Sequence, residues 1–172
     1  MAPPLLPKKV AITSASAATK KMKGGKVVAF CDRNCNVLAL FVTAAGNQNE
    51  SPLFREALPR LTSLAKTLGL GLYGSVISLD GAYGSRSDRK AIFNWGMTHN
   101  IYENPRGRKT AKRGRRQLFN LMIFKKRFRT IERVFAREDK FRRLLLRFER
   151  RSEVHYAFKT LAYTLINLRY FC

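Results

Sequence analysis

The order of hydrophobic segments predicts an α/β fold, a mixed sheet flanked by helices. Three observations lead to this prediction: β-rich runs fill residues 26–42, a helical leucine pattern fills residues 53–68, and a strand–helix–strand passage spans residues 76–103. Strands that alternate with helices pack in layers, because each buries its apolar face against the other. At 172 residues and 45% hydrophobic composition, one domain with a real core is expected. Residues 1–25, rich in Pro, Ser, Ala and Lys, are expected to be a loose lead-in to a domain over 26–172.

The first elements are predicted from turn and cap residues. A break at residues 32–34 (Asp-Arg-Asn) between two β-rich runs predicts a hairpin, with Asp32 as a turn residue. Ser51 as N-cap, with Pro52 at the first helical position, predicts a helix that stops at Gly69. The side chains expected on its buried face are Leu53, Leu58, Leu61, Leu64 and Leu68.

The middle of the chain predicts a second strand–helix–strand unit. Val76, Ile77 and Leu79 form a short apolar strand that ends at Asp80 and a following glycine. A short helix is expected over residues 86–95, and another strand near residues 100–103. Loops at the carboxyl ends of strands form the crevice of an open α/β sheet, so Asp80 lies where functional residues are common.

The last third of the chain predicts a basic loop and two helices. Residues 104–116 have many cations and no apolar stripe, and helical spacing begins near residue 117. A final helix is expected from Val154 to Arg169. The side chains expected to face the core are Phe124, Phe128, Ile131 and Phe135 in the first helix, and Phe158, Leu161, Leu165 and Leu168 in the second.

The charge of the chain predicts a polyanionic partner. There are 34 Lys and Arg against 11 Asp and Glu, a formal net charge of +23, and residues 104–150 alone hold 18 of these cations against four acids. Nucleic acid is the first expectation and an anionic membrane surface the second, although no apolar run is long enough to span a bilayer. No groove-reading motif is present, so contacts are expected mainly with phosphates. The expected DNA-binding residues are Arg106, Arg108, Lys109, Lys112, Arg113, Arg115, Arg116, Lys125, Lys126, Arg127 and Arg129.

Two carboxylates in this basic chain are the candidate metal ligands. Asp80 could instead start a turn or cap the next helix, and Glu132 could simply pair with Arg129 on a solvated helix face. Together, carboxylates from two elements could hold Mg²⁺ or Mn²⁺, ions that prefer hard oxygen ligands and serve phosphodiester chemistry in pairs. Such a site normally has a third carboxylate.

The cysteines and histidines point to no further chemistry. Cys31 and Cys35 have a C-x3-C spacing, but no second pair completes a zinc site, and three cysteines fit a reducing compartment. His99 and His155 are isolated in the sequence and are expected to be ordinary histidines. The N-terminus lacks the apolar core of a signal peptide, so we expect a cytoplasmic location.

Several segments resemble the C-terminal part of insertion-sequence transposases of the DDE class, which have a ribonuclease-H-like core and carry out DNA recombination. They are LDGAYGSR at 79–86, RTIERVFAREDKFRRLLLRFER at 129–150, FKTLAYTLINLR at 158–169 and GNQNES at 46–51. The resemblance implies that Asp80 and Glu132 are the second and third catalytic carboxylates and the metal ligands. It also implies a DNA partner, self-association on DNA, metal-dependent hydrolysis and strand transfer, and a place on a bacterial nucleoid.

The sequence departs from this family pattern mainly at its front. No acid precedes Asp32, so the first strand is expected to be degraded or missing, and Thr13 or Ser14 would stand at the first ligand position. A hydroxyl replaces a carboxylate poorly as a ligand of Mg²⁺. The lysine usual seven residues after the glutamate is Asp139 here. We therefore expect a truncated copy that binds DNA and does not turn over.

Two other functions remain open from the sequence. A non-enzymatic, basic nucleic-acid-binding protein would explain the charge but would leave Asp80 and Glu132 without a task. A decayed product that never folds stably is the second alternative, because a missing central strand would leave a sheet unpaired.

Overall fold

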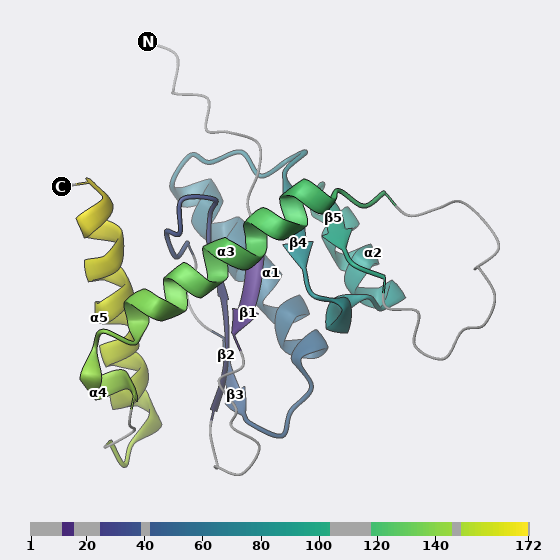
Figure 1. Cartoon of the computed structure of the whole chain (residues 1–172). Helices are drawn as coiled ribbons and strands as arrows, with labels where there is room; N and C mark the ends of the chain where they lie inside the picture. Colours follow the sequence, from purple (N-terminus) through teal and green to yellow (C-terminus); the bar gives the residue numbers. More distant parts are fainter. Residues whose placement is uncertain (1–11, 16–24, 39–41, 104–117, 146–148, 172) are drawn as a thin grey trace.

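The computed structural model describes residues 12–15, 25–38, 42–103, 118–145 and 149–171. The described chain is a mixed α/β arrangement, as the sequence predicts. Figure 1 shows the strands in the middle, helix α1 behind them and helix α3 crossing in front. The hairpin, helix, strand, helix, strand and two late helices follow in the expected order.

In the described parts of the chain, five short strands form two sheets that meet side by side. Strand β1 (Ile12–Ala15) pairs antiparallel with β2 (Gly25–Phe30), which pairs antiparallel with β3 (Val42–Ala45). Strand β4 (Val76–Leu79) pairs in parallel with β5 (Thr98–Ile101). Because β1 also lies beside β4, the strands follow one another in space as β3, β2, β1, β4 and β5.

Strand β1 lies in a part of the sequence that we expected to be a loose lead-in. Its four residues pair in register with β2, from Ile12 opposite Phe30 to Ala15 opposite Val27. A strand is therefore formed in this part of the chain, where we expected one to be degraded or missing. The composition around it, rich in Ser, Ala and Lys, gives little strand signal, and the pairing with β2 decides its conformation.

The hairpin and the first helix agree with the sequence apart from the cap. Asp32 does lie in the turn after β2, where its side chain accepts hydrogen bonds from the backbone N–H groups of Asn34 and Asn36. Helix α1 (Glu50–Thr67) begins earlier than expected, because Asn49 and not Ser51 is its N-cap. It ends before Gly69, whose φ of 67° suits glycine. Of the expected leucines, Leu68 is exposed; the buried residues are Leu53, Phe54, Ala57, Leu58, Leu61 and Ala65.

Helix α2 (Arg86–Asn94) is tied to α1 through a buried carboxylate. Ser85 caps α2 and accepts a hydrogen bond from the Asp88 backbone N–H, while the Asp88 side chain accepts from the Ser85 hydroxyl. Asp88 is 0% exposed and also accepts from the Ser51 hydroxyl and from Arg55 Nη1 at 2.7 Å. This arrangement fixes α2 beside the start of α1.

The late helices are α3 (Leu121–Glu138), α4 (Arg142–Leu145) and α5 (Ser152–Phe171). Their predicted inward faces are wrong in part. On α3, Phe128 is 55% exposed, and the buried residues are Arg127, Thr130 and Val134. On α5, three of the four expected residues, Leu161, Leu165 and Leu168, are exposed, and the buried ones are Ala162, Tyr163 and Ile166. The predicted helical period was correct. Relative to the predicted orientation, however, both helices are rotated about their axes, because the elements they pack against determine which face is buried.

Two apolar clusters support the described chain. The larger one lies between α1, α2 and the strands and includes Phe54, Leu58 and Ile77. The smaller one joins the hairpin to α3 and α5 and consists of Cys31, Cys35, Val134, Tyr163 and Ile166. Docking of α5 is completed by a reciprocal pair of hydrogen bonds between the Asn167 side chain and the Val37 backbone.

Candidate functional site

Asp80 directly follows β4, at the carboxyl end of that strand. Its side chain is exposed and accepts a hydrogen bond of 2.6 Å from the Gly81 backbone N–H, which begins the short 3₁₀ helix η1 (Gly81–Tyr83). Asp80 therefore caps the next turn, which was one of the alternatives considered from the sequence. A carboxylate has two oxygens and about four acceptor sites, so this cap leaves capacity for a ligand.

The turn after Asp80 is fixed against the start of α1. The Tyr83 hydroxyl donates to Glu50 at 3.0 Å, and Lys26 lies 3.6 Å from the same carboxylate. Burial and the neighbouring Glu50 carboxylate raise the pKa of Tyr83 above its ordinary value, so this tyrosine stays protonated as a donor. Asp80 is therefore held on a well-anchored turn.

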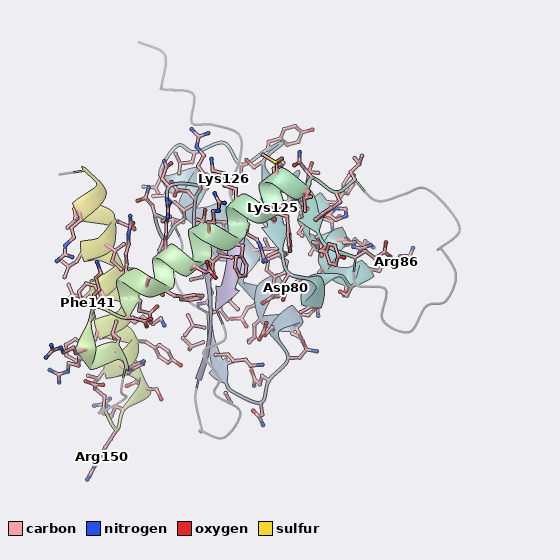
Figure 2. All side chains as sticks on the ribbon, viewed as in Figure 1. Asp80, Arg86, Lys125, Lys126, Phe141 and Arg150 are labelled. Atoms are coloured by element: carbon pink, nitrogen blue, oxygen red, sulfur yellow. The ribbon has the colours of Figure 1, made fainter. Side chains whose placement is uncertain are left out.

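Glu132 lies on the solvent-exposed face of α3, away from the residues of the helix that are buried. It is exposed, and seven residues, about two helical turns, separate it from Lys125, so the two share an outer face of the helix. Figure 2 shows Lys125 and Lys126 along the upper edge of α3 and Asp80 below the helix. Among the described residues the Glu132 side chain makes no hydrogen bond or ion pair, so the expected alternative of a pair with Arg129 is not formed.

The strand next to β4 carries no acidic residue. Strand β1 lies beside β4, but its sequence Ile-Thr-Ser-Ala contains no acid. Within the described parts of the chain, no three His, Cys, Asp or Glu residues lie together in a way that could hold a metal ion. The described residues, as they are arranged, therefore do not fit a centre for two divalent ions, which needs several carboxylate ligands.

Arg127 occupies the buried side of α3 facing the sheet. It is 7% exposed, and its guanidinium carbon lies 4.7 Å from the centre of the Phe124 ring. Burial lowers the pKa of Arg127, and the negative charge of Asp80 opposes that change. Its buried Nε has no hydrogen-bond partner in the described structure. Of the four expected DNA-binding cations that the structure describes, Arg127 is the one that is not exposed to solvent.

A basic groove lies along α3, at the opposite end of β4 from Asp80. It has a volume of about 570 Å³ and reaches Val76, the first residue of β4. Six of its lining residues are cations: Arg33, Lys125, Lys126, Arg127, Arg129 and Arg133. The other described residues of the lining are Val76, Met122, Ile123 and Thr130, so no acid is among the described residues that line the groove. We call this hollow the α3 groove.

The structure thus brings together four of the expected DNA-binding residues and adds two that the sequence analysis missed. Arg33 comes from the hairpin turn, where the two Asp32 oxygens accept from Asn34 and Asn36 and fix the loop. Only its place beside Asp32 in a turn hinted at exposure. Arg133 follows Arg129 by four residues, and this i, i+4 spacing could have placed it on the same helix face. The expected contacts at 106–116 lie outside the described residues.

The start of α3 is anchored next to the end of β5. The Asn100 side chain accepts from the Asn120 backbone N–H at 2.7 Å and donates to the Asn120 carbonyl at 3.1 Å. Asn120 in turn caps α3, and the rings of Tyr102, Phe119 and Phe124 pack together beside it. These contacts fix the helix that carries the groove.

The fold and the site together define a mixed α/β protein with a carboxylate at a strand end and a strongly basic helix across the sheet. Residues 7–166 match the family described as Transposase DDE domain, which covers β1 as well as the later helices. The chain belongs to this family. No curated protein and no solved structure matches the chain.

Membership of the family bears on the partners of this protein. DDE transposases act on DNA and generally use divalent metal ions. In the described part of the chain, no helix is long and apolar enough to cross a membrane.

Proposed function

We propose that this chain is a transposase-like, DNA-binding protein with a ribonuclease-H-like core that no longer cuts DNA. The family match over residues 7–166 supports a DNA substrate. The observation that carries the loss of cutting is the sequence of β1, the strand beside β4, which offers Thr13 and Ser14 in place of an acid.

The strand arrangement supports the ribonuclease-H-like core. Three strands pair antiparallel, two pair in parallel, and β1 lies in the middle beside β4. In this arrangement Asp80 ends the strand next to β1, where the resemblance places the second catalytic carboxylate. Glu132 would have to turn inward from the outer face of α3 to share an ion with Asp80. The proposal therefore treats Asp80 and Glu132 as the remaining two members of an ancestral set of three.

A nicking assay on supercoiled plasmid DNA with Mg²⁺ or Mn²⁺ tests the loss of catalysis. The unmodified chain is expected to give no more nicked product than a metal-free control. Thr13→Asp and Ser14→Asp each restore a carboxylate on β1, and one of them is expected to gain metal-dependent nicking. Nicking by the unmodified chain that disappears in both Asp80→Asn and Glu132→Gln would show that the site is complete as it stands.

DNA binding is tested by the salt dependence of affinity for duplex DNA. Each cation that neutralises a phosphate should contribute about 0.9 to the slope of log affinity against log salt. Alanine at the seven expected loop contacts is therefore expected to reduce the slope markedly; they are Arg106, Arg108, Lys109, Lys112, Arg113, Arg115 and Arg116. An unchanged slope would remove this loop from the DNA-binding surface.

The alternative function, a non-enzymatic basic nucleic-acid-binding protein, makes a different prediction. It expects DNA binding but no gain of nicking in either β1 variant, because its carboxylates would never have belonged to one centre. Self-association on DNA also belongs to the proposal; Leu161, Leu165 and Leu168 present exposed apolar side chains on α5 that could support it. Light scattering with and without DNA tests this part.

A further inference from the structure

We propose that the α3 groove binds an unpaired stretch of nucleic acid, with its phosphates on the groove cations and its bases or sugars over the apolar floor. This inference rests on the proposed DNA-binding function and adds where an unpaired strand lies. The groove is formed by three separate segments, the hairpin turn, the start of β4 and one side of α3. It is therefore built by the fold and is more than a run of basic residues on one helix.

The charges of the groove select for an anion. Six cations line it and no acid does, so a negative ligand would meet no repelling carboxylate on its walls. Arg127 adds an independent observation, because it is more than nine-tenths buried, lines the groove and has an Nε without a hydrogen-bond partner in the described structure. Buried polar groups are nearly always satisfied, so an unpaired donor at this place favours a ligand with acceptor oxygens.

The shape and the apolar floor favour an unpaired strand over a duplex. A hollow of about 570 Å³ has room for a nucleotide unit, whereas a duplex presents a broad convex backbone that would span the rim. Val76, Met122 and Ile123 give the groove an apolar surface, and Met122 is 76% exposed. Unpaired bases expose apolar faces that a duplex keeps stacked, so they can cover this surface.

The groove is separate from the candidate catalytic carboxylate. Val76 begins β4 and Asp80 follows its last residue. Val76 and Asp80 therefore lie at opposite ends of the strand, roughly 13 Å apart along four residues. A strand held at the Val76 end of the groove would therefore lie away from Asp80, although the charge of Asp80 acts on Arg127 in the groove lining. The groove would retain one strand while another part of the surface contacts duplex DNA.

The test compares two double variants that each remove two positive charges. Arg129→Ala/Arg133→Ala removes groove cations, and Arg86→Ala/Lys90→Ala removes exposed cations from α2. Arg86 lies away from Lys125 and Lys126 in Figure 2. Affinities for a single-stranded oligothymidine and for a duplex of equal length are measured by fluorescence anisotropy over a range of salt concentrations. Thermal melting followed by circular dichroism verifies that both variants fold.

The groove variant is expected to bind the single strand about tenfold more weakly and to lose about 1.4 from its salt slope, at about 0.7 for each phosphate contact. The α2 variant should lose at most about threefold, as expected from the general charge. Equal losses of single-strand affinity in the two variants would overturn the assignment of the groove. The proposed binding of duplex DNA would not be affected by that result. If the unmodified chain binds neither DNA form at low salt, the proposed DNA-binding function fails as well.

A second variant tests the apolar floor. Met122→Gln keeps the charge and lies on an exposed side chain, so it should not affect folding. It is expected to weaken binding of oligothymidine about threefold but to leave an abasic oligomer of the same length unchanged, because only the former places bases on the floor. Equal binding of the oligothymidine and the abasic oligomer by the unmodified chain would show that the groove holds phosphates alone, and would overturn the assignment of bases to the floor.

Discussion

The α1–α2 half of the molecule and the α3–α5 half are held in place in different ways. The first half packs its helices on the strands through one continuous apolar cluster and encloses Asp88 completely. The second half has a small apolar cluster, with Val134, Tyr163 and Ile166 at its centre, and leaves the large side chain of Phe128 exposed. Much of its attachment comes from polar pairs at the ends of its helices.

This difference separates scaffold from function. Continuous apolar burial gives the first half most of the stability, because burial of apolar area is the dominant favourable contribution to folding. In the second half, α3 directs cations such as Lys126 and Arg129 to solvent and buries Arg127 under the helix. The helix that carries the basic groove is thus less well supported by apolar contacts, and substitutions should have unequal effects in the two halves.

Asp88→Ala should give the largest loss of stability. The substitution removes a fully buried carboxylate and leaves Arg55, Ser51 and Ser85 without their acceptor. Because Arg55 is 36% exposed, the cost should be about 3 kcal/mol, the low end for a buried charge pair, and urea unfolding would measure it. Glu56→Ala, which removes an exposed carboxylate paired with Arg60, is the matched control and should change stability by less than about 0.5 kcal/mol. Similar values for both variants would contradict the stated role of Asp88.

Ile166→Ala tests the smaller cluster and should cost about 2 kcal/mol, near the lower end for such truncations. Ile166 is 4% exposed on α5, whereas its neighbour Leu165 is 39% exposed and supplies the control on the same helix. Leu165→Ala should cost clearly less. If Leu165→Ala were the more damaging variant, α5 would have to be rotated toward the face that we expected from the sequence.

Glu138→Gln should have a smaller effect, about 1 kcal/mol, on the attachment of α5 to α3. The Glu138 carboxylate accepts from Lys159 Nζ at 2.5 Å and from the Tyr163 hydroxyl. Glutamine keeps the size but loses the charge, so both bonds become weaker. Lys159→Met should cost a similar amount, and the double variant should cost less than the sum of the two. Strictly additive losses would show that the two side chains do not act together.

Turns and element ends were largely readable from the sequence, although the N-cap of α1 is Asn49 and not the expected Ser51, and contacts between distant segments were not readable. The turn after β2, the end of α1 before Gly69 and the strand end at Asp80 follow from the residues at those positions. The period of α3 was also readable, but its inward face was not, because Arg127 is buried where Phe128 was expected. An amphipathic pattern gives the spacing of a buried stripe, and the packing partner decides which residues near its edge become buried.

The candidate site shows the same division. The position of Asp80 could be predicted because a strand and a glycine flank it. The burial of Asp88 could not be predicted. Ser85 lies three residues before Asp88, which is the spacing of a capping box, but this spacing does not indicate burial. The α3 groove needed the structure, because Arg33 and Arg133 are a hundred residues apart in the sequence and meet only through the hairpin and the crossing helix. Strand β1 could be recognised only from its pairing with β2 in the structure.

The smallest predicted effect is an acid-dependent loss of stability from His99 on β5. Burial lowers the pKa of His99, and the nearby Arg89 guanidinium lowers it further. Because the folded state binds the proton less readily than the unfolded state, this contribution is present above the unfolded pKa of about 6.5 and is lost as the pH falls below it. Urea unfolding between about pH 7 and pH 5 should therefore show a shallower pH dependence in His99→Gln than in the unmodified chain.

Arg89→Met separates the two causes of this pKa shift at His99. Removing the guanidinium leaves the burial of the imidazole unchanged, so the loss of stability at acid pH should become smaller but should not disappear. A slope in Arg89→Met as shallow as that in His99→Gln would assign the whole effect to the charge of Arg89. An unchanged slope in both variants would mean that His99 titrates alike in the folded and unfolded chains.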